Sequence, residues 1–125
     1  TDPRSRTWPR LAGRWLATAA HERPGQAPVL LRVYARTGLL SMRRAMDASR
    51  RHDVAQAVAR TACPLLLVRG RHDRIAPADW VESLAALREG RRVSLPVGAH
   101  MVPITHAQHL AALLGPWLRA VTPAA

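Results

Sequence analysis

The segment PLLLVRGRHDRIAP, residues 64–77, constrains the fold of this chain more than any other part of the sequence. Its apolar run, residues 65–68, predicts a strand that is buried on both faces of a parallel sheet. The run leads directly into a polar turn that contains Gly70 and Asp73. Because loops meet at the carboxyl ends of the strands in an open α/β sheet, this turn puts the carboxylate of Asp73 where such sheets bind ligands.

A second strand is predicted over residues 91–97, where apolar and other residues alternate. Pro96 lacks the backbone N–H that a sheet needs, so this strand is an edge strand or ends near Pro96. A Gly-led turn that carries His100 follows it. Between the two strands, residues 77–90 have the pattern of a helix that starts after Pro77 and stops at Gly90. A strand, a helix and a second strand predict a parallel crossover.

The rest of the chain is predicted to be helical. Thr105 and Gln108 have the spacing of a capping box, and apolar residues at helical spacing continue to residue 118, so a final helix is expected to pack on the sheet. Residues 1–60 predict three or four amphipathic helices and no strand. Within this part, residues 23–28 are a break, Ser41 is expected to cap the third helix, and Asp53 begins the fourth.

Residues 53–119 resemble the C-terminal part of an α/β-hydrolase-fold enzyme, from its seventh strand to its last helix. In that family the catalytic acid follows the penultimate strand in a G-x-x-D-x-x-x-P pattern, which is matched here by Gly70, Asp73 and Pro77. The catalytic base follows the last strand in a small-small-His turn, matched by Gly-Ala-His at residues 98–100. The order along the chain also agrees, because the family runs nucleophile, acid, base.

The resemblance implies an α/β fold in which residues 61–125 are the C-terminal portion of the hydrolase core, with the last two parallel strands and their flanking helices. Residues 1–60 would form the helical cap that such enzymes insert before the penultimate strand, and a plain helical layer on the core is the alternative. Tyr34, Met42 and Met46 would either line an acyl pocket of the cap or belong to its core.

The chemistry that the resemblance implies is nucleophilic acyl transfer to water, on a small ester or another hydrophobic acyl compound. His100 would take the proton of the nucleophile, and Asp73 would fix the tautomer of the imidazole and stabilise the imidazolium. Histidine suits this task because its ordinary pKa lies near neutrality. We expect no cofactor and no metal.

The nucleophile has no candidate in this sequence. The chain contains no G-x-S-x-G motif, and family members with Asp at that turn leave Ser and Asp both open. Complete members are about twice as long as these 125 residues, so we expect the chain to be the C-terminal half of a longer enzyme and inactive by itself. An unpaired apolar strand edge would make the isolated chain self-associate or leave it partly unfolded.

The net charge of +11 would by itself favour a nucleic-acid or membrane-surface partner. All 19 basic residues are Arg, however, and 12 of them fall in residues 1–60, which hold only 4 acidic residues. This pattern is more typical of a compositional bias with a solvated surface than of a binding face. The sequence has neither a nucleic-acid motif nor an apolar stretch of the ~20 residues that a membrane span needs.

The remaining histidines and the one cysteine are assigned no task. His72, His106 and His109, taken with Asp73 and His100, could be drawn as a metal cluster, but we expect no metal there, because partial solvation explains these histidines without a ligand. Cys63 is expected to be a small buried residue, and a single cysteine permits no internal disulfide, which is compatible with a cytoplasmic protein.

Two alternatives to a hydrolase stay open: a non-catalytic relative that serves binding or assembly, and an Arg-rich module for nucleic acid or a membrane surface. Steep loss of binding with added salt would distinguish the second.

Overall fold

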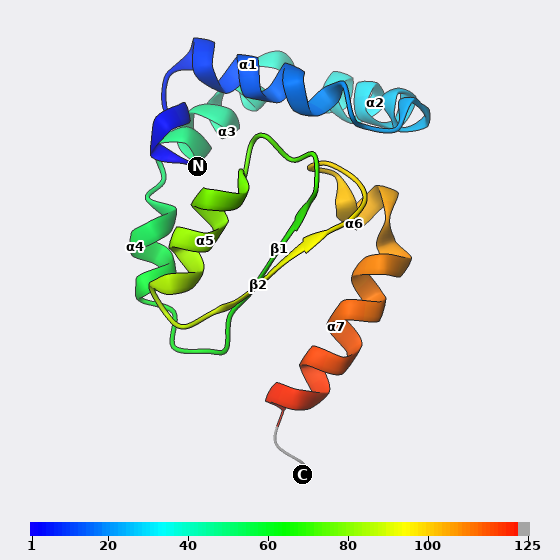
Figure 1. The fold of residues 1–125 in the computed structure, drawn as a ribbon. Coiled ribbons are helices and arrows are strands. Elements are labelled where there is room, and N and C mark those ends of the chain that lie inside the picture. The colour runs from blue at the N-terminus through cyan, green and yellow to red at the C-terminus, as the bar shows by residue number, and fades with distance from the viewer. Residues whose placement is uncertain (123–125) are drawn as a thin grey trace.

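The structure is a computed structural model that describes residues 1–122, in which helices surround a small parallel sheet (Figure 1). The strands are β1 (Leu66–Gly70) and β2 (Arg91–Leu95). The helices are η1 (Pro3–Ser5), α1 (Trp8–Ala19), η2 (Pro24–Gln26), α2 (Ala27–Thr37), α3 (Leu39–Arg51), α4 (Val54–Ala59), α5 (Ala78–Ala86), α6 (Val102–Thr105) and α7 (Ala107–Val121), where η marks a 3-10 helix. The chain is therefore a mixed α/β structure, as the sequence predicts.

The parallel strand, helix and strand predicted from the sequence are confirmed. β1 pairs with β2 in parallel, from Leu66 opposite Arg91 to Gly70 opposite Leu95, and α5 packs on both strands. β2 ends at Leu95 and not at Val97, because Pro96 has no N–H to continue the ladder. The apolar residues of β1 are half-buried rather than buried, because within residues 1–122 this strand has a paired neighbour along one edge only.

The main core lies around α5 and the ends of the strands. Its buried apolar side chains come from α5, from its neighbours α1, α4 and β2, and from the segment that follows β2: Leu11, Val58, Val81, Leu84, Ala85, Leu95, Ala99 and Val102. Cys63 was expected in such a core, but it is exposed, because it lies in the open connection between α4 and β1. Part of this core, formed by Leu95, Ala99 and Val102, therefore sits beside the carboxyl ends of the two strands.

Helix α5 ends differently from the prediction. It begins after Pro77 as expected, but its stop is made by Glu89, which has the left-handed φ of 52°, while the Gly90 N–H bonds to the Ala85 carbonyl at 2.8 Å. Gly90 contacts the residue before β1 closely. A Cβ atom there would lie 2.9 Å from the side chain of Leu65, so a larger residue would push against the residue that precedes β1.

Residues 1–60 contain four α-helices and no strand, where the sequence predicts three or four helices and no strand. The fourth begins as predicted, because the Asp53 carboxylate accepts the Gln56 N–H at 3.0 Å. The role predicted for Ser41 is wrong. The third helix begins at Leu39, directly after Gly38, whose φ of 78° turns the chain, so Ser41 lies inside the helix.

A buried carboxylate joins the N-terminal segment to the rest of the molecule. Asp2, 1% exposed, is paired with Arg4 at 2.8 Å and with Arg14 of α1 at 2.5 Å, and Arg4 also reaches Asp79 of α5 at 2.6 Å. Burial raises the pKa of Asp2, but the bonds from Arg4 and Arg14 outweigh it and lower that pKa to about 2. The first residues are thus tied to both α1 and α5.

The predicted capping box at Thr105 is wrong. The Thr105 hydroxyl donates to the Met101 carbonyl at 2.9 Å, and His106, with a φ of −139°, separates α6 from α7. Helix α7 then runs through Gly115 and Pro116, and its apolar residues Leu113, Leu114 and Trp117 are half-buried rather than buried. No helix within residues 1–122 has both the length and the apolar character needed to cross a membrane.

Candidate active site

The turn after β1 holds Asp73 in one position. The Oδ1 atom of Asp73 accepts the N–H groups of Ile75 and Ala76 at 2.8 and 2.9 Å, and the Asp73 N–H donates to the Gly70 carbonyl at 3.1 Å. Asp73 is 3% exposed. These bonds use Oδ1 and leave Oδ2 free to meet another group, so the turn presents a buried carboxylate with one open oxygen.

Arg69 of β1 fixes this turn from inside. Its guanidinium donates to the carbonyls of Asp73 at 2.6 Å and Ala76 at 2.8 Å, and to the Ser94 hydroxyl of β2 at 3.3 Å. The side chain is buried, and its donors meet carbonyl and hydroxyl oxygens instead of a carboxylate. Sequence reasoning missed Arg69, although an Arg inside an apolar strand and next to Gly70 is a visible signal.

The turn after β2 packs backbone against backbone on the turn after β1. The His72 N–H donates to the Gly98 carbonyl at 3.0 Å, and Gly98 has a left-handed φ of 74°. A Cβ atom on Gly70 would lie 2.3 Å from the Ala99 carbonyl oxygen, so only glycine permits this approach. The two turns therefore reach their positions as one unit.

The structure brings Asp73 and His100 together, as the sequence predicts. The distance from the His100 Nδ1 to the Asp73 Oδ2 is 2.9 Å, and the His100 side chain is 47% exposed. Because an ionised carboxylate only accepts hydrogen bonds, the proton of the neutral imidazole lies on Nδ1 and the lone pair on Nε2. Within residues 1–122 no protein group, and therefore no hydroxyl or thiol that could serve as a nucleophile, hydrogen-bonds to the Nε2 of His100.

The pKa values of the pair move in opposite directions. The bond from Asp73 raises the pKa of His100 against the effect of its burial, and the nearby Glu22 carboxylate adds to the rise. Burial raises the pKa of Asp73, but the bonds from His100, Ala76 and Ile75 together outweigh it and lower that pKa. Asp73 therefore stays ionised, and its charge stabilises a proton on His100.

The end of α1 contacts both turns through side chains that sequence reasoning missed. The Thr18 hydroxyl accepts the Arg74 N–H at 3.0 Å, and the Glu22 carboxylate accepts the Met101 N–H at 2.8 Å. We call residues 18–23 the corner. Nothing in the local sequence marks it, because these contacts join residues far apart in the chain.

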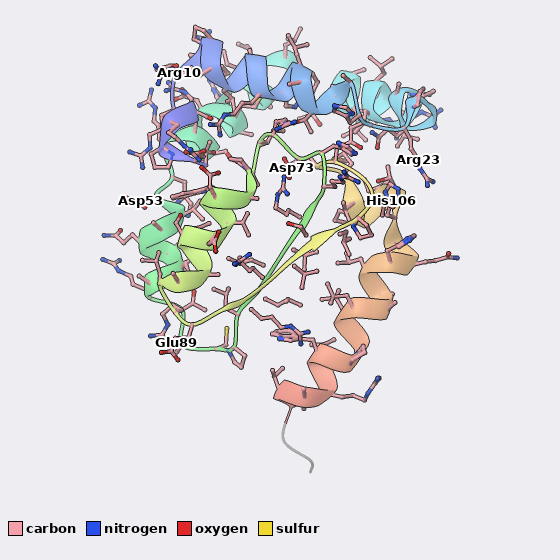
Figure 2. All side chains as sticks on the ribbon, viewed as in Figure 1. Arg10, Arg23, Asp53, Asp73, Glu89 and His106 are labelled. Carbon is pink, nitrogen blue, oxygen red and sulfur yellow. The ribbon has the colours of Figure 1, made fainter. Side chains whose placement is uncertain are left out.

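The other histidines lie around the site without forming a metal centre. His72 stacks on His21 of the corner with ring centroids 4.5 Å apart, and burial beside His21 and three arginines lowers the pKa of His72. The His106 Nε2 lies 3.4 Å from the Arg23 Nη2, and the His106 ring lies edge-on to His109. Figure 2 labels Arg23 and His106 close to each other. Among residues 1–122, no three His, Cys, Asp or Glu side chains are placed to hold a metal ion.

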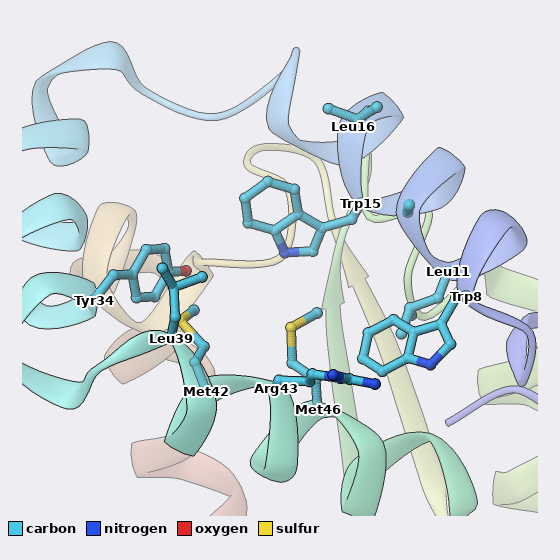
Figure 3. A pocket seen from close by; sticks show the side chains of 10 residues that line it. Trp8, Leu11, Trp15, Leu16, Tyr34, Leu39, Met42, Arg43 and Met46 are labelled. Atoms are coloured by element: carbon cyan, nitrogen blue, oxygen red, sulfur yellow. The ribbon is translucent and has the colours of Figure 1, made fainter.

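An apolar cavity of about 460 Å³ lies between α1 and the helices α2 and α3. Figure 3 shows the two tryptophans of α1 facing the methionines of α3 across it. The residues that line it are Trp8, Leu11, Ala12, Trp15, Leu16, Tyr34, Leu39, Met42, Arg43 and Met46. The structure thus gathers Tyr34, Met42 and Met46 around an open space.

Comparison of the chain with protein-family models, with curated proteins and with solved structures found no match in any of the three.

Proposed function

We propose that this chain supplies the acid and the base of an α/β-fold hydrolase that acts on a small ester or a related hydrophobic acyl compound. The observation that carries the proposal is the Asp73–His100 pair at 2.9 Å, with the carboxylate buried and the far nitrogen of the imidazole open. In this proposal β1, α5, β2 and α7 belong to the C-terminal part of the hydrolase core, and residues 1–60 are its cap.

The geometry fits general-base chemistry. A neutral His100 with its proton on Nδ1 has its lone pair on Nε2, where it can take the proton of a nucleophile as the new bond forms. Asp73 stabilises the imidazolium that results, and that imidazolium then gives its proton to the leaving group. Since no hydroxyl within residues 1–122 reaches His100, the proposed nucleophile comes from outside these residues.

Two nucleophiles are compatible with the pair. A serine would attack the acyl carbonyl, release the alcohol of the ester and be freed from the acyl group by water. An aspartate would instead need an alkylating substrate such as an epoxide, whose C–O bond it opens to form an alkyl-enzyme ester that water then cleaves. A fluorophosphonate probe labels the serine, whereas a trapped alkyl ester found by mass spectrometry identifies the aspartate. Translating the coding frame upstream of Thr1 would show which residue stands in a strand-to-helix turn.

The test is ester hydrolysis by the protein as its gene encodes it. His100→Ala is expected to lower kcat by about three orders of magnitude or more. His52→Ala is the matched control, because His52 is exposed at the end of α3. Equal turnover of His100→Ala and the unchanged protein would remove His100 from the role of base.

A second candidate function, ligand binding without catalysis, is favoured by the apolar cavity. Arg43 is a lining residue, and it forms no ion pair with any residue in the described range, so its charge suits an anionic head group on an apolar chain. Dodecanoate should quench the fluorescence of Trp8 and Trp15 and dodecanol should bind more weakly. If Arg43→Gln binds dodecanoate as tightly as the unchanged chain does, this candidate is wrong.

We also propose a cytoplasmic location, because Cys63 is an exposed thiol and such a thiol persists best in a reducing compartment.

A further inference from the structure

Among the acidic residues of residues 1–60, Glu22 is the one whose carboxylate hydrogen-bonds to a turn of the candidate site. It lies after α1, 79 residues before the residue it contacts, and its Oε1 accepts the Met101 N–H at 2.8 Å. Its Oε2 accepts from the Gln26 side chain at 3.1 Å. Both oxygens are therefore engaged, one with the turn that carries His100 and the other with η2, so the carboxylate has a fixed position.

The turn that carries His100 is held from two sides. On one side the Gly98 carbonyl accepts the His72 N–H, and on the other side the Met101 N–H meets Glu22. These two bonds enclose His100 in the sequence. Without the bond to Glu22, the Met101 N–H would have no hydrogen-bond acceptor among residues 1–60.

We propose that Glu22 is a positioning residue of the active site, which holds the His100 turn against the corner and adds a negative charge beside the imidazole. This inference rests on the proposed hydrolase function for its consequence in turnover, but the contact and the charge are properties of the chain itself. It gives residues 1–60 a direct part in the chemistry, beyond covering a pocket.

The charge of Glu22 acts in the same direction as that of Asp73. Asp73 makes the larger contribution to the raised pKa of His100, and Glu22 adds to it through space. These are the two carboxylates that raise this pKa. Because a general base works in its neutral form, removing the charge of Glu22 should make His100 active at a lower pH.

Two variants separate the contact from the charge. Glu22→Gln keeps a carbonyl oxygen for the Met101 N–H and removes the charge, whereas Glu22→Ala removes both. Glu89→Gln is the matched control, because it also removes one negative charge but lies at the far end of the sheet from Asp73 (Figure 2). The readouts are NMR titration of the His100 imidazole and hydrogen exchange of the Met101 amide, which need no turnover.

The expected results differ between the variants. Glu22→Gln should lower the pKa of His100 while the Met101 amide stays protected, and Glu22→Ala should also lose about tenfold or more of that protection. Glu89→Gln should change neither. An unchanged His100 titration and Met101 protection in Glu22→Ala, or equal changes in Glu89→Gln, would overturn the inference.

Turnover provides the second arm. In the protein as its gene encodes it, the acid limb of kcat/KM should move to lower pH in Glu22→Gln and stay in place in Glu89→Gln. A shifted titration without any ester hydrolysis would support the role of Glu22 and contradict the hydrolase. Ester hydrolysis whose acid limb is unshifted in Glu22→Gln would support the hydrolase and contradict the role of Glu22.

Discussion

The carboxyl edge of the sheet and the helices α2 and α3 are built in opposite ways. At the sheet edge, Asp73 and Arg69 are buried and meet partners through several hydrogen bonds, and a glycine permits the two turns to touch. In α2 and α3 no residue is buried, although both helices are strongly amphipathic. Their apolar residues face a cavity or lie exposed.

The difference shows that a chain can fix the position of a functional side chain without burying much apolar surface area nearby. The sheet edge holds its side chains by directional bonds, which specify one geometry. Helices α2 and α3 each have an apolar stripe but little to bury it against within residues 1–122. The corner connects the two regions. It lies at the end of α1, and its side chains hydrogen-bond to the turn after β1 and to the turn after β2.

The largest expected effect is on turnover. Asp73→Asn should keep the shape of the turn but put an amide beside His100, which allows the other tautomer and removes the charge that stabilises the imidazolium. We expect kcat of the protein as its gene encodes it to fall roughly 10⁴-fold, with KM little changed. Asp53→Asn, at the distant cap of α4, should leave kcat as it is. A loss below tenfold in Asp73→Asn would mean that the pair does not act as acid and base.

A pair of equal truncations tests the contrast in packing. Leu84 of α5 is 5% exposed and Leu31 of α2 is 68% exposed. Leu84→Ala should lower the free energy of unfolding by about 3 kcal/mol, and Leu31→Ala by less than about 0.5 kcal/mol. Urea unfolding followed by circular dichroism measures both. Equal losses would show that α2 is packed in solution as firmly as α5.

The local parts of the site could be predicted from the sequence. The apolar run before Gly70 and the alternation before Gly98 locate two strand ends, and parallel strands bring their carboxyl ends together, so Asp73 and His100 meet. Side-chain signals for a helix start were less reliable where the backbone conformation of a neighbouring residue sets the first residue of the helix. Gly38 and not Ser41 starts α3, and His106 and not Thr105 separates the last two helices.

A glycine substitution tests how tightly the two turns touch. Because a Cβ on Gly70 would overlap the Ala99 carbonyl oxygen at 2.3 Å, Gly70→Ala should cost about 2 to 3 kcal/mol and displace His100. Gly13→Ala is the control. Gly13 lies inside α1 with nothing within 4 Å of its Cβ position, so this change should stabilise the chain by about 0.5 to 1 kcal/mol. Similar effects of the two substitutions would contradict the close approach.

What the sequence did not show are the contacts between distant segments. Arg69 and Glu22 act on turns through side-chain bonds whose partners depend on how α1 and the sheet are placed. Hydrophobic periodicity specifies which face of a helix is apolar and not which polar group at its end will meet a turn. The cavity is a similar case, because Tyr34, Met42 and Met46 have the same spacing in a core and in a pocket lining.

The smallest expected effect concerns acid, and it tests the buried carboxylate of the N-terminal segment. Asp2 has a pKa of about 2 in the folded chain, below its value of about 3.9 in the unfolded chain. A lowered folded pKa contributes stability that is present above about pH 4 and is lost as pH falls toward 2, on the order of 1 kcal/mol. Asp2→Asn should therefore flatten the decline of stability between pH 4 and pH 2. The comparison variant is Asp47→Asn, which removes a half-buried carboxylate that pairs with Arg50 and Arg51 within α3. Thermal melts across this range decide the matter, and equal slopes for Asp2→Asn and the unchanged chain would mean that the network of Asp2, Arg4 and Arg14 does not hold in solution.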